Sequence, residues 1–442
     1  MRIVHALGWY FPDSLGGTEV YVAALGRLLR ERGHDVLIAA PDARRDTEYS
    51  YKHAGTEVFR YPIPANPTRS EAQGRVRVKG SDRFHSWIER TKPEIIHCHS
   101  LVTGLGLEEL KVARSVGAGV VVTCHTPSLG FVCQRGTMMR WGKELCDGLA
   151  EPAKCASCVL QASGLPMPFS RLASQIPQTF SLLGAFLPGR IGTGIGMSAA
   201  IQRNLKRQKE LLELADSFVV LTEWAFDVVA RNMGSERKLV LNRLGIDRVP
   251  IRNENENHVR KGPPRFGYVG RFHETKGIFV LAEALAGLPS DLPFSLEFRG
   301  PMMSTEDRLV RDRLEQVLRG DTRVRFTPAV EHSEIARVLR EYDVLLCPST
   351  WLEGGPTVAM ESQAVGTPVV GSRMGGLAEI VEDGRNGRLL PPGDAKALAT
   401  AIVDIVRDPS VIQRWRRRLP APRTMADVTT DYVTIYERSL RK

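Results

Sequence analysis

The 442-residue sequence has no apolar stretch long enough to cross a membrane. The best candidate for a membrane segment, the uncharged run Leu172–Gly189, is broken by Pro177 and Pro188, whereas a spanning helix needs about 20 predominantly apolar residues. We expect this run to pack normally, with an amphipathic segment lying on a membrane surface as the alternative. The short opening run Met1–Leu7 has no cleavage-like site, which argues against a secretory signal peptide.

Other features that the sequence lacks narrow the possible classes of protein further. No basic stripe interleaved with aromatic residues is present, so a nucleic-acid partner is not expected. There is no short-period repeat, which excludes a solenoid. Acidic residues are fewer than basic ones, and the net charge of +10 favours anionic partners such as nucleotide diphosphates, or serves only solubility. We expect a protein of the cytoplasm with free thiols, alternatively held at the inner face of the membrane.

The chain alternates short apolar runs with amphipathic stretches, which predicts βαβ units and parallel sheets. A helix is expected over Thr18–Arg32, with Gly33 at its end. The expected strands are Arg2–Leu7, Val36–Ala40, Glu94–Cys98, Val120–Cys124, Phe218–Leu221, Arg265–Val269, Ser295–Phe298, Val324–Thr327, Val344–Cys347 and Pro368–Gly371.

A chain of this length exceeds what one core usually supports, so two domains are expected. The polar stretch 253–263 is the best linker, between a first domain over 1–252 and a second over 264–425. The first carries a cysteine-rich insertion near 130–160. The last segment, 426–442, is an amphipathic helix that ends the second domain or crosses back to the first. The predicted fold class is α/β, with two Rossmann-like domains facing a cleft.

The strongest motif follows the expected strand Val344–Cys347. A loop with Glu353, Gly354 and Gly355 leads to Pro356, which suits a first helical position, and to Glu361 within the helix. The amides around Gly354–Thr357 would form a helix N-terminus, which favours an anion such as a pyrophosphate. Carboxylates beside it suit sugar hydroxyls.

A second motif supplies positive charge. Arg271 and Lys276 follow the strand Arg265–Val269, and the carboxyl ends of parallel strands are where such sheets place ligands. Together the two side chains could clamp a diphosphate and neutralise it as a leaving group. The two glutamates alone could be surface carboxylates, and the two cations alone could be a solvated pair. Their combination predicts a nucleotide-sugar site.

These motifs together resemble the GT-B, family-four retaining glycosyltransferases (glycosyl transferases group 1). The resemblance spans most of the chain except roughly 130–200, and it departs from the common pattern at Gly355 and Ser362. It rests on Gly270-Arg271 with Lys276-Gly277, Glu353-Gly354 with Glu361, Gly366–Ser372, Gly375–Ile380, Asp383–Gly387 with Pro392–Asp394, Gly16–Glu19, Gly33–Val36 and Val122–Thr126.

The resemblance implies the roles of the site residues. Arg271 and Lys276 would hold the donor diphosphate, Glu361 the ribose hydroxyls, and Glu353 the donor sugar. The backbone around Gly354, Gly355, Pro356 and Thr357 would lie against the donor. Gly17 would approach the phosphate from the first domain, and His125 would reach the sugar or the acceptor, although a histidine and a Gly-Gly pair can also be purely structural.

The resemblance also implies the substrates. The donor would be a UDP- or GDP-sugar, used without a catalytic metal because the basic pair replaces it. The acceptor would be a hydroxyl of a glycan, a lipid-linked glycan or a small molecule, with peripheral membrane association as one option. Two rival functions remain on the same fold: a sugar-nucleotide epimerase, and a non-catalytic nucleotide- or glycan-binding protein.

The insertion is defined by Cys133, Cys146, Cys155 and Cys158, spaced C-x12-C-x8-C-x2-C. The terminal C-x-x-C is a good chelating pair, and four thiolates would complete a tetrahedral structural zinc site. Disulfides and unpaired thiols are the alternatives. Because the insertion follows His125, we expect it to shape acceptor selection. His97 and His99 flank Cys98 at a strand end, where hydrogen bonding is favoured over metal binding.

Overall fold

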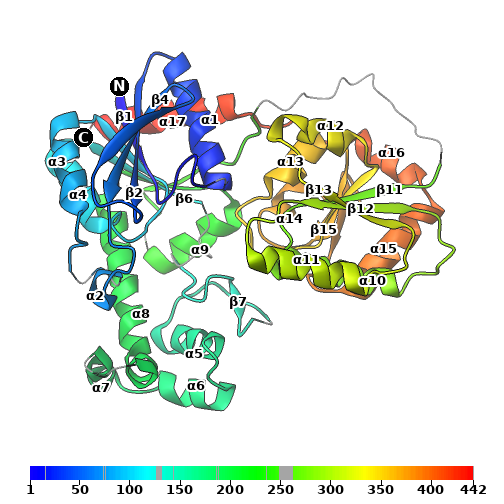
Figure 1. Ribbon diagram of the computed structural model, residues 1–442, viewed down its shortest axis with the longest axis horizontal. Helices are drawn as coiled ribbons and strands as arrows, with labels where there is room; N and C mark the ends of the chain where they lie inside the picture. The colour runs from blue at the N-terminus through cyan, green and yellow to red at the C-terminus, as the bar shows by residue number, and fades with distance from the viewer. Residues whose placement is uncertain are drawn as a thin grey trace. The chain divides into compact units, whose positions relative to one another are not determined.

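The computed structural model describes residues 1–441 except Leu15, Gln73, Arg75, 126–131, Lys143, Phe186, Pro188, Ser235 and 248–261. The chain divides into two compact units (Figure 1). Unit 1 comprises Met1–Arg243 and the C-terminal segment from Met425, and unit 2 comprises Leu244–Thr424. Most of the expected linker, 253–261, lies outside the described residues.

Unit 1 is built on an eight-stranded sheet in the order β10-β9-β6-β5-β1-β2-β4-β3. Every pairing is parallel except that of β3 with β4. Strands β1, β5, β6 and β9 are almost entirely buried, as expected for apolar runs covered on both faces. The strands are β1 Arg2–Ala6, β2 Asp35–Asp42, β3 Tyr49–His53, β4 Thr56–Pro62, β5 Ile95–Cys98, β6 Gly119–Cys124, β9 Ser217–Val220 and β10 Leu239–Leu241.

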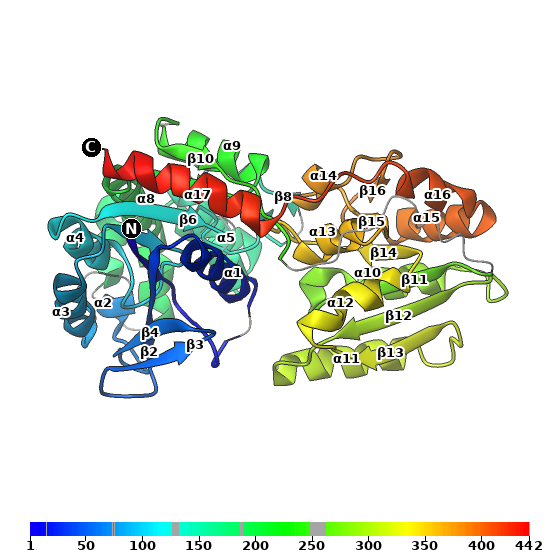
Figure 2. The same ribbon diagram turned by 90° about the horizontal axis from the view of Figure 1, so that it is seen from above.

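Helices of unit 1 cover this sheet, and the last of them returns from the end of the chain. Helix α17 (Met425–Leu440) packs against α1 (Gly17–Glu31) and β6, as Figure 2 shows. The Tyr21 hydroxyl of α1 donates to the Tyr432 hydroxyl of α17 at 3.2 Å, in the buried interior. Outside the segment between β6 and β9, unit 1 also has the helices α2 Arg69–Ala72, α3 Ser81–Thr91 and α4 Leu107–Ser115, and α9 Glu223–Met233 lies between β9 and β10.

Between β6 and β9 the chain forms a mainly helical insertion. Its described part has a short hairpin followed by helices, none of which the sequence analysis predicted. Figure 1 places α6 and α7 at the end of α8 remote from the sheet. The elements are β7 Met139–Arg140, β8 Glu144–Leu145, α5 Pro152–Ala162, α6 Met167–Ser174, α7 Gln178–Ser181, the 3-10 helix η1 Leu182–Ala185 and α8 Gly189–Leu214.

The uncharged run Leu172–Gly189 thus spans several short elements rather than one helix. Among the residues that the structure describes, every helix is too short or too polar to span a bilayer.

Unit 2 contains a six-stranded parallel sheet in the order β13-β12-β11-β14-β15-β16. The chain leaves β11 in one direction along the sheet and returns to its other side at β14, which makes β11/β14 the topological switch point. The strands are β11 Arg265–Val269, β12 Ser295–Gly300, β13 Val324–Pro328, β14 Val344–Cys347, β15 Val369–Ser372 and β16 Gly387–Leu390.

Two hydrophobic clusters cover this sheet, one centred on Phe266, Leu281 and Ile402 and the other on Leu339 and Leu345. Local capping supports the helices: the Ser304 hydroxyl accepts from the Asp307 amide at the start of α11. The helices of unit 2 are η2 Glu274–Lys276, α10 Ile278–Ala286, α11 Thr305–Val317, η3 His332–Glu334, α12 Ile335–Arg340, α13 Thr357–Ala364, α14 Leu377–Ile380, α15 Ala395–Arg407 and α16 Ser410–Arg416.

Candidate functional site

In unit 2, the loops that follow β11 and β14 meet at the switch point. The Thr350 amide donates to the Thr275 carbonyl at 2.8 Å, and the Ser349 hydroxyl donates to the same oxygen at 3.1 Å. A backbone hydrogen bond and a side-chain hydrogen bond therefore join the two sequence motifs. A site built on such loops is held by the rigid sheet beneath it.

The charged residues of the two motifs form an ion pair. Lys276 Nζ lies 2.8 Å from Glu353 Oε2, and the Ser349 hydroxyl donates to Glu353 Oε1 at 2.7 Å. Both oxygens of the carboxylate therefore have a donor, and its side chain is only 17% exposed. Lys276 remains about one-third exposed, so its ammonium, with three donors, can still reach a bound anion.

Glycines allow these loops to approach closely. A Cβ on Gly277, whose φ is +72°, would lie 1.8 Å from the Pro348 carbonyl oxygen. A Cβ on Gly376 would lie 2.7 Å from the Gly355 Cα, and the Gly376 amide donates to the Glu353 carbonyl at 3.0 Å. The Gly375-Gly376 pair thus packs directly against the loop that carries Glu353 and holds it by a hydrogen bond. The sequence did not indicate this role.

Arg271 is the second cation of unit 2. Its guanidinium donates to the buried Asp307 carboxylate at 3.0 Å, while half of its side chain stays exposed. Asp307 is desolvated, but its bond from Arg271 and those from the Met303 and Ser304 amides outweigh this and lower its pKa. The aspartate holds one edge of the guanidinium and leaves other N–H groups for a ligand.

Glu361 differs from Glu353 in lacking a cation partner. It lies on α13, is 7% exposed, and burial raises the pKa of its carboxyl, an effect that His332 partly offsets. No hydrogen bond from the described residues reaches this carboxylate, so it suits hydroxyl donors of a ligand. Pro356 is the N-cap of α13 and the helix begins at Thr357, one residue later than expected. Gly354 and Gly355 lie partly exposed just before it.

In unit 1, the predicted residues Gly17 and His125 follow β1 and β6. Gly17 is the first residue of α1, and a Cβ there would meet nothing within 4 Å. Packing within the unit therefore does not require this glycine. Gly16, the N-cap, is tighter, because its Cβ would lie 2.4 Å from a Glu19 carboxylate oxygen.

His125 is the end of a buried chain of imidazoles. His99 Nδ1 lies 3.1 Å from His125 Nε2, and His99 Nε2 lies 2.9 Å from His5 Nδ1. Burial lowers the pKa of His125 to about 4 and that of His5 to about 3, so both rings are neutral near pH 7. Since Nε2 is taken by His99, Nδ1 is the nitrogen of His125 that is left for a substrate.

Three histidines of this region are close enough together to suggest a metal site. Ligand nitrogens of His5, His97 and His99 all lie within 4.8 Å of one another. His97, however, uses both of its nitrogens, each at 2.7 Å, on the Tyr436 hydroxyl and the Thr123 hydroxyl. Hydrogen bonding, as expected for His97 and His99, accounts for this arrangement without an ion.

The four cysteines of the insertion line one open hollow. They are free, and burial raises the pKa of Cys155 to about 11, which is unlike the acidic thiol of a redox or nucleophilic site. Their sulfurs form no group as tight as that of the three histidines.

One exposed side chain of unit 1 was missed by the sequence reasoning. Trp9 follows β1 in the loop before α1 and is 58% exposed. Tryptophan is enriched at binding interfaces, although a single exposed aromatic is also common on protein surfaces. An aromatic directly after the first strand of a Rossmann-like unit was the available signal.

Two family profiles match the chain. Residues 16–245 match the family described as "Glycosyl transferase 4-like domain", and residues 251–420 match "Glycosyl transferases group 1". The 2-deoxystreptamine N-acetyl-D-glucosaminyltransferase of Streptomyces fradiae is 27% identical over 444 residues, covering 92% of this chain and 86% of that protein. Glycogen synthase of Mycobacterium tuberculosis is 29% identical over 249 residues, covering 54% of this chain; the chain spans only 58% of that relative's length.

Solved structures share the fold. Sucrose-phosphate synthase of Thermosynechococcus elongatus superimposes with a TM-score of 0.65 at 20% identity, covering 99% of each chain. Anabaena HepE in complex with UDP gives a TM-score of 0.65 at 15% identity, covering 99% of this chain and 100% of that one. The predicted GT-B fold class is confirmed.

Proposed function

Because the chain belongs to the group 1 glycosyltransferases of the GT-B fold, we propose that it moves a hexose from a nucleoside-diphosphate sugar to an acceptor hydroxyl and retains the anomeric configuration. The observation that carries this proposal is the Lys276–Glu353 pair at the switch point of unit 2. It presents a cation for a diphosphate and a carboxylate for a sugar side by side.

Each residue then has one task. Arg271 and Lys276 bind the diphosphate and stabilise its charge as the bond to the sugar breaks. Glu361, buried and free of donors from the described residues, accepts the ribose hydroxyls. Glu353 accepts sugar hydroxyls, and the amides at the start of α13 face the anion. The donor is a UDP- or GDP-sugar; that HepE was solved with UDP supports the first.

Retention follows from same-face substitution. The anomeric C–O bond to the diphosphate breaks, the acceptor oxygen bonds to that carbon on the same face, and the acceptor proton passes to the departing phosphate oxygen. No protein nucleophile is used, and the two cations take the place of a catalytic metal. His125, neutral at pH 7, contributes a hydrogen bond rather than a charge.

A nucleotide-sugar screen tests the proposal. Incubation with UDP- and GDP-hexoses should release nucleoside diphosphate faster when an acceptor is added, and NMR of the product should show the anomeric configuration of the donor. Conversion of the donor sugar without an acceptor would favour an epimerase. Binding with no turnover of any donor would favour a binding protein.

A surface of the insertion fits one of the three acceptor options, a lipid-linked glycan at the inner face of the membrane. On α6, α7 and the start of α8, apolar side chains point to solvent: Leu172 is 72%, Phe180 61% and Ile191 71% exposed. From Pro152 to Lys209 the sequence has seven basic residues and no acidic one. Such a combination fits the interface of an anionic bilayer.

Vesicle binding checks this surface. We expect the protein to sediment with vesicles containing phosphatidylserine and not with phosphatidylcholine alone. The double substitution Leu172→Glu and Phe180→Glu should weaken binding at least about tenfold. It replaces two apolar side chains that would insert into the bilayer with carboxylates that anionic lipids repel. Leu309→Glu, at a residue 65% exposed on α11 of unit 2, is the control. Equal binding by both variants would exclude this surface.

A further inference from the structure

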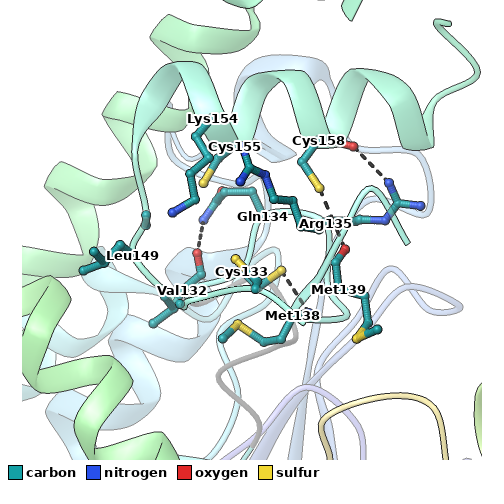
Figure 3. Close-up of a pocket in the computed structure, with 14 residues that line it drawn as sticks. Val132, Cys133, Gln134, Arg135, Met138, Met139, Leu149, Lys154, Cys155 and Cys158 are labelled. Carbon is teal, nitrogen blue, oxygen red and sulfur yellow. Dashed lines mark hydrogen bonds between the residues drawn. The ribbon is translucent and has the colours of Figure 1, made fainter. Parts of the chain in front are cut away.

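Four cysteines from two segments of the insertion surround one hollow. Cys155 and Cys158 project from the same face of α5, one turn apart, and Figure 3 shows them directed toward the loop that carries Cys133. Cys146 follows the β7–β8 hairpin and lines the same hollow. The chain thus places two thiols on a helix opposite two thiols on the flanks of a hairpin.

Two backbone hydrogen bonds of this hollow suit sulfur as a thiolate, while the Cys146 and Cys158 thiols lie within donor distance of the Asp147 carboxylate (3.7 Å) and the Met139 carbonyl (3.9 Å). The Met138 amide donates to Cys133 Sγ at 3.2 Å, and the Trp141 amide donates to Cys158 Sγ at 3.3 Å. Amide donors to metal-bound sulfur orient the ligand and spread its negative charge. Lys154, only 13% exposed, also lines the hollow and pairs with Asp147 at 2.6 Å. Its ammonium is a nearby positive charge for a site with an excess of thiolates.

Regular structure is sparse in the segment, although Val132 and Met138 are buried and Arg135 donates to the Cys158 carbonyl. Its regular structure before α5 is one hairpin with two residues in each strand. Met138 and Trp141 adopt left-handed backbone, with φ of 54° and 52°, which costs non-glycine residues about 1 kcal/mol or more each. A short, strained segment of this kind is usually held by a cross-link that hydrophobic burial cannot replace.

We propose that Cys133, Cys146, Cys155 and Cys158 bind one Zn²⁺ in a tetrahedral structural site. Binding replaces four S–H bonds with four Zn–S bonds and releases four protons to solvent; no electrons are transferred. Zinc–sulfur bonds of about 2.3 Å require the hairpin and α5 to draw together around the ion. The ion then ties the segment 133–146 to helix α5.

Metal analysis of the full chain purified with a reductant tests the site. We expect one zinc per chain, seven titratable thiols after denaturation with a chelator, and the charge-transfer absorption of tetrahedral thiolate-bound Co²⁺ after exchange. Cys146→Ser and Cys155→Ser should each lose at least about tenfold in metal affinity. Cys98→Ala, at a buried thiol of β5 away from the hollow, should keep the metal.

Each contrary outcome is distinct. Seven thiols with no zinc and no Co²⁺ spectrum would mean unpaired cysteines. Fewer than seven thiols in the metal-free, unreduced protein would mean disulfides. Should the serine variants fail to fold, the Co²⁺ spectrum of the unsubstituted protein decides the matter alone. None of these readouts depends on sugar transfer, so the zinc site and the proposed activity stand or fall separately.

Discussion

Replacing Glu353 with glutamine is expected to lower kcat for sugar transfer by about 10²–10³-fold, the usual loss when one preorganised transition-state contact is removed. The substitution keeps the size of the side chain but removes the charge that pairs with Lys276 at 2.8 Å. The glutamine can still meet Ser349. Lys276 would then be free to bind phosphate more strongly, so the affinity for nucleoside diphosphate should be unchanged or higher.

The control for this substitution is Glu283→Gln, at an exposed position of α10 in the same unit. It should leave kcat and KM within about twofold, as surface changes usually do. Single-turnover rates and diphosphate Kd values measure the two effects separately. Transfer at an undiminished rate in the Glu353 variant would remove this residue from the proposed mechanism.

Replacing Arg271 with alanine should raise the Kd for nucleoside diphosphate by about 10- to 100-fold, because hydrogen bonds to a charged group contribute about 1.5–3 kcal/mol. The Kd for the nucleoside alone should not change, since the guanidinium is assigned to the phosphates. Helix α11 should remain capped in the variant, because Asp307 still accepts from the Met303 and Ser304 amides.

Arg313→Ala provides the matched comparison. Arg313 lies on α11, is 68% exposed, and its 3.6 Å ion pair with Glu274 is open to solvent, where such pairs contribute little. Isothermal titration of both variants with diphosphate and with nucleoside should therefore separate a phosphate contact from a general change in surface charge. An equal loss for both ligands would contradict the assignment of Arg271.

Sequence reasoning located the sheets better than the insertion. Strands β11 and β14 begin and end where they were expected, because buried parallel strands are short apolar runs between turn residues. Strands β3, β4, β10 and β16 of the two sheets were missed, and so was α8. That helix contains Gly192, Gly194 and Gly196 and has no clean apolar stripe, so its contacts with α5 and η1 rather than its own periodicity hold it.

The sequence indicated the individual residues of the candidate site but not the contacts between them. The ends of β11 and β14 indicated Arg271, Lys276 and Glu353, but 77 residues separate the ion-paired Lys276 and Glu353, and no local pattern encodes that contact. The burial of Glu361 and the chain His5–His99–His125 depend on how the sheets pack, which a single sequence does not display. The roles of these residues remain proposals.

The return of α17 to unit 1 sets an order on biosynthesis. Tyr432 and Tyr436 fill the interior beside Thr123 and His97, yet they are synthesised after all of unit 2. During translation, unit 2 can therefore complete its core first, whereas the packing around β6 is completed only after Tyr432 and Tyr436 have been synthesised. The interior around His97, whose ring packs against that of His99 in the imidazole chain, is thus completed last, by the C-terminal helix.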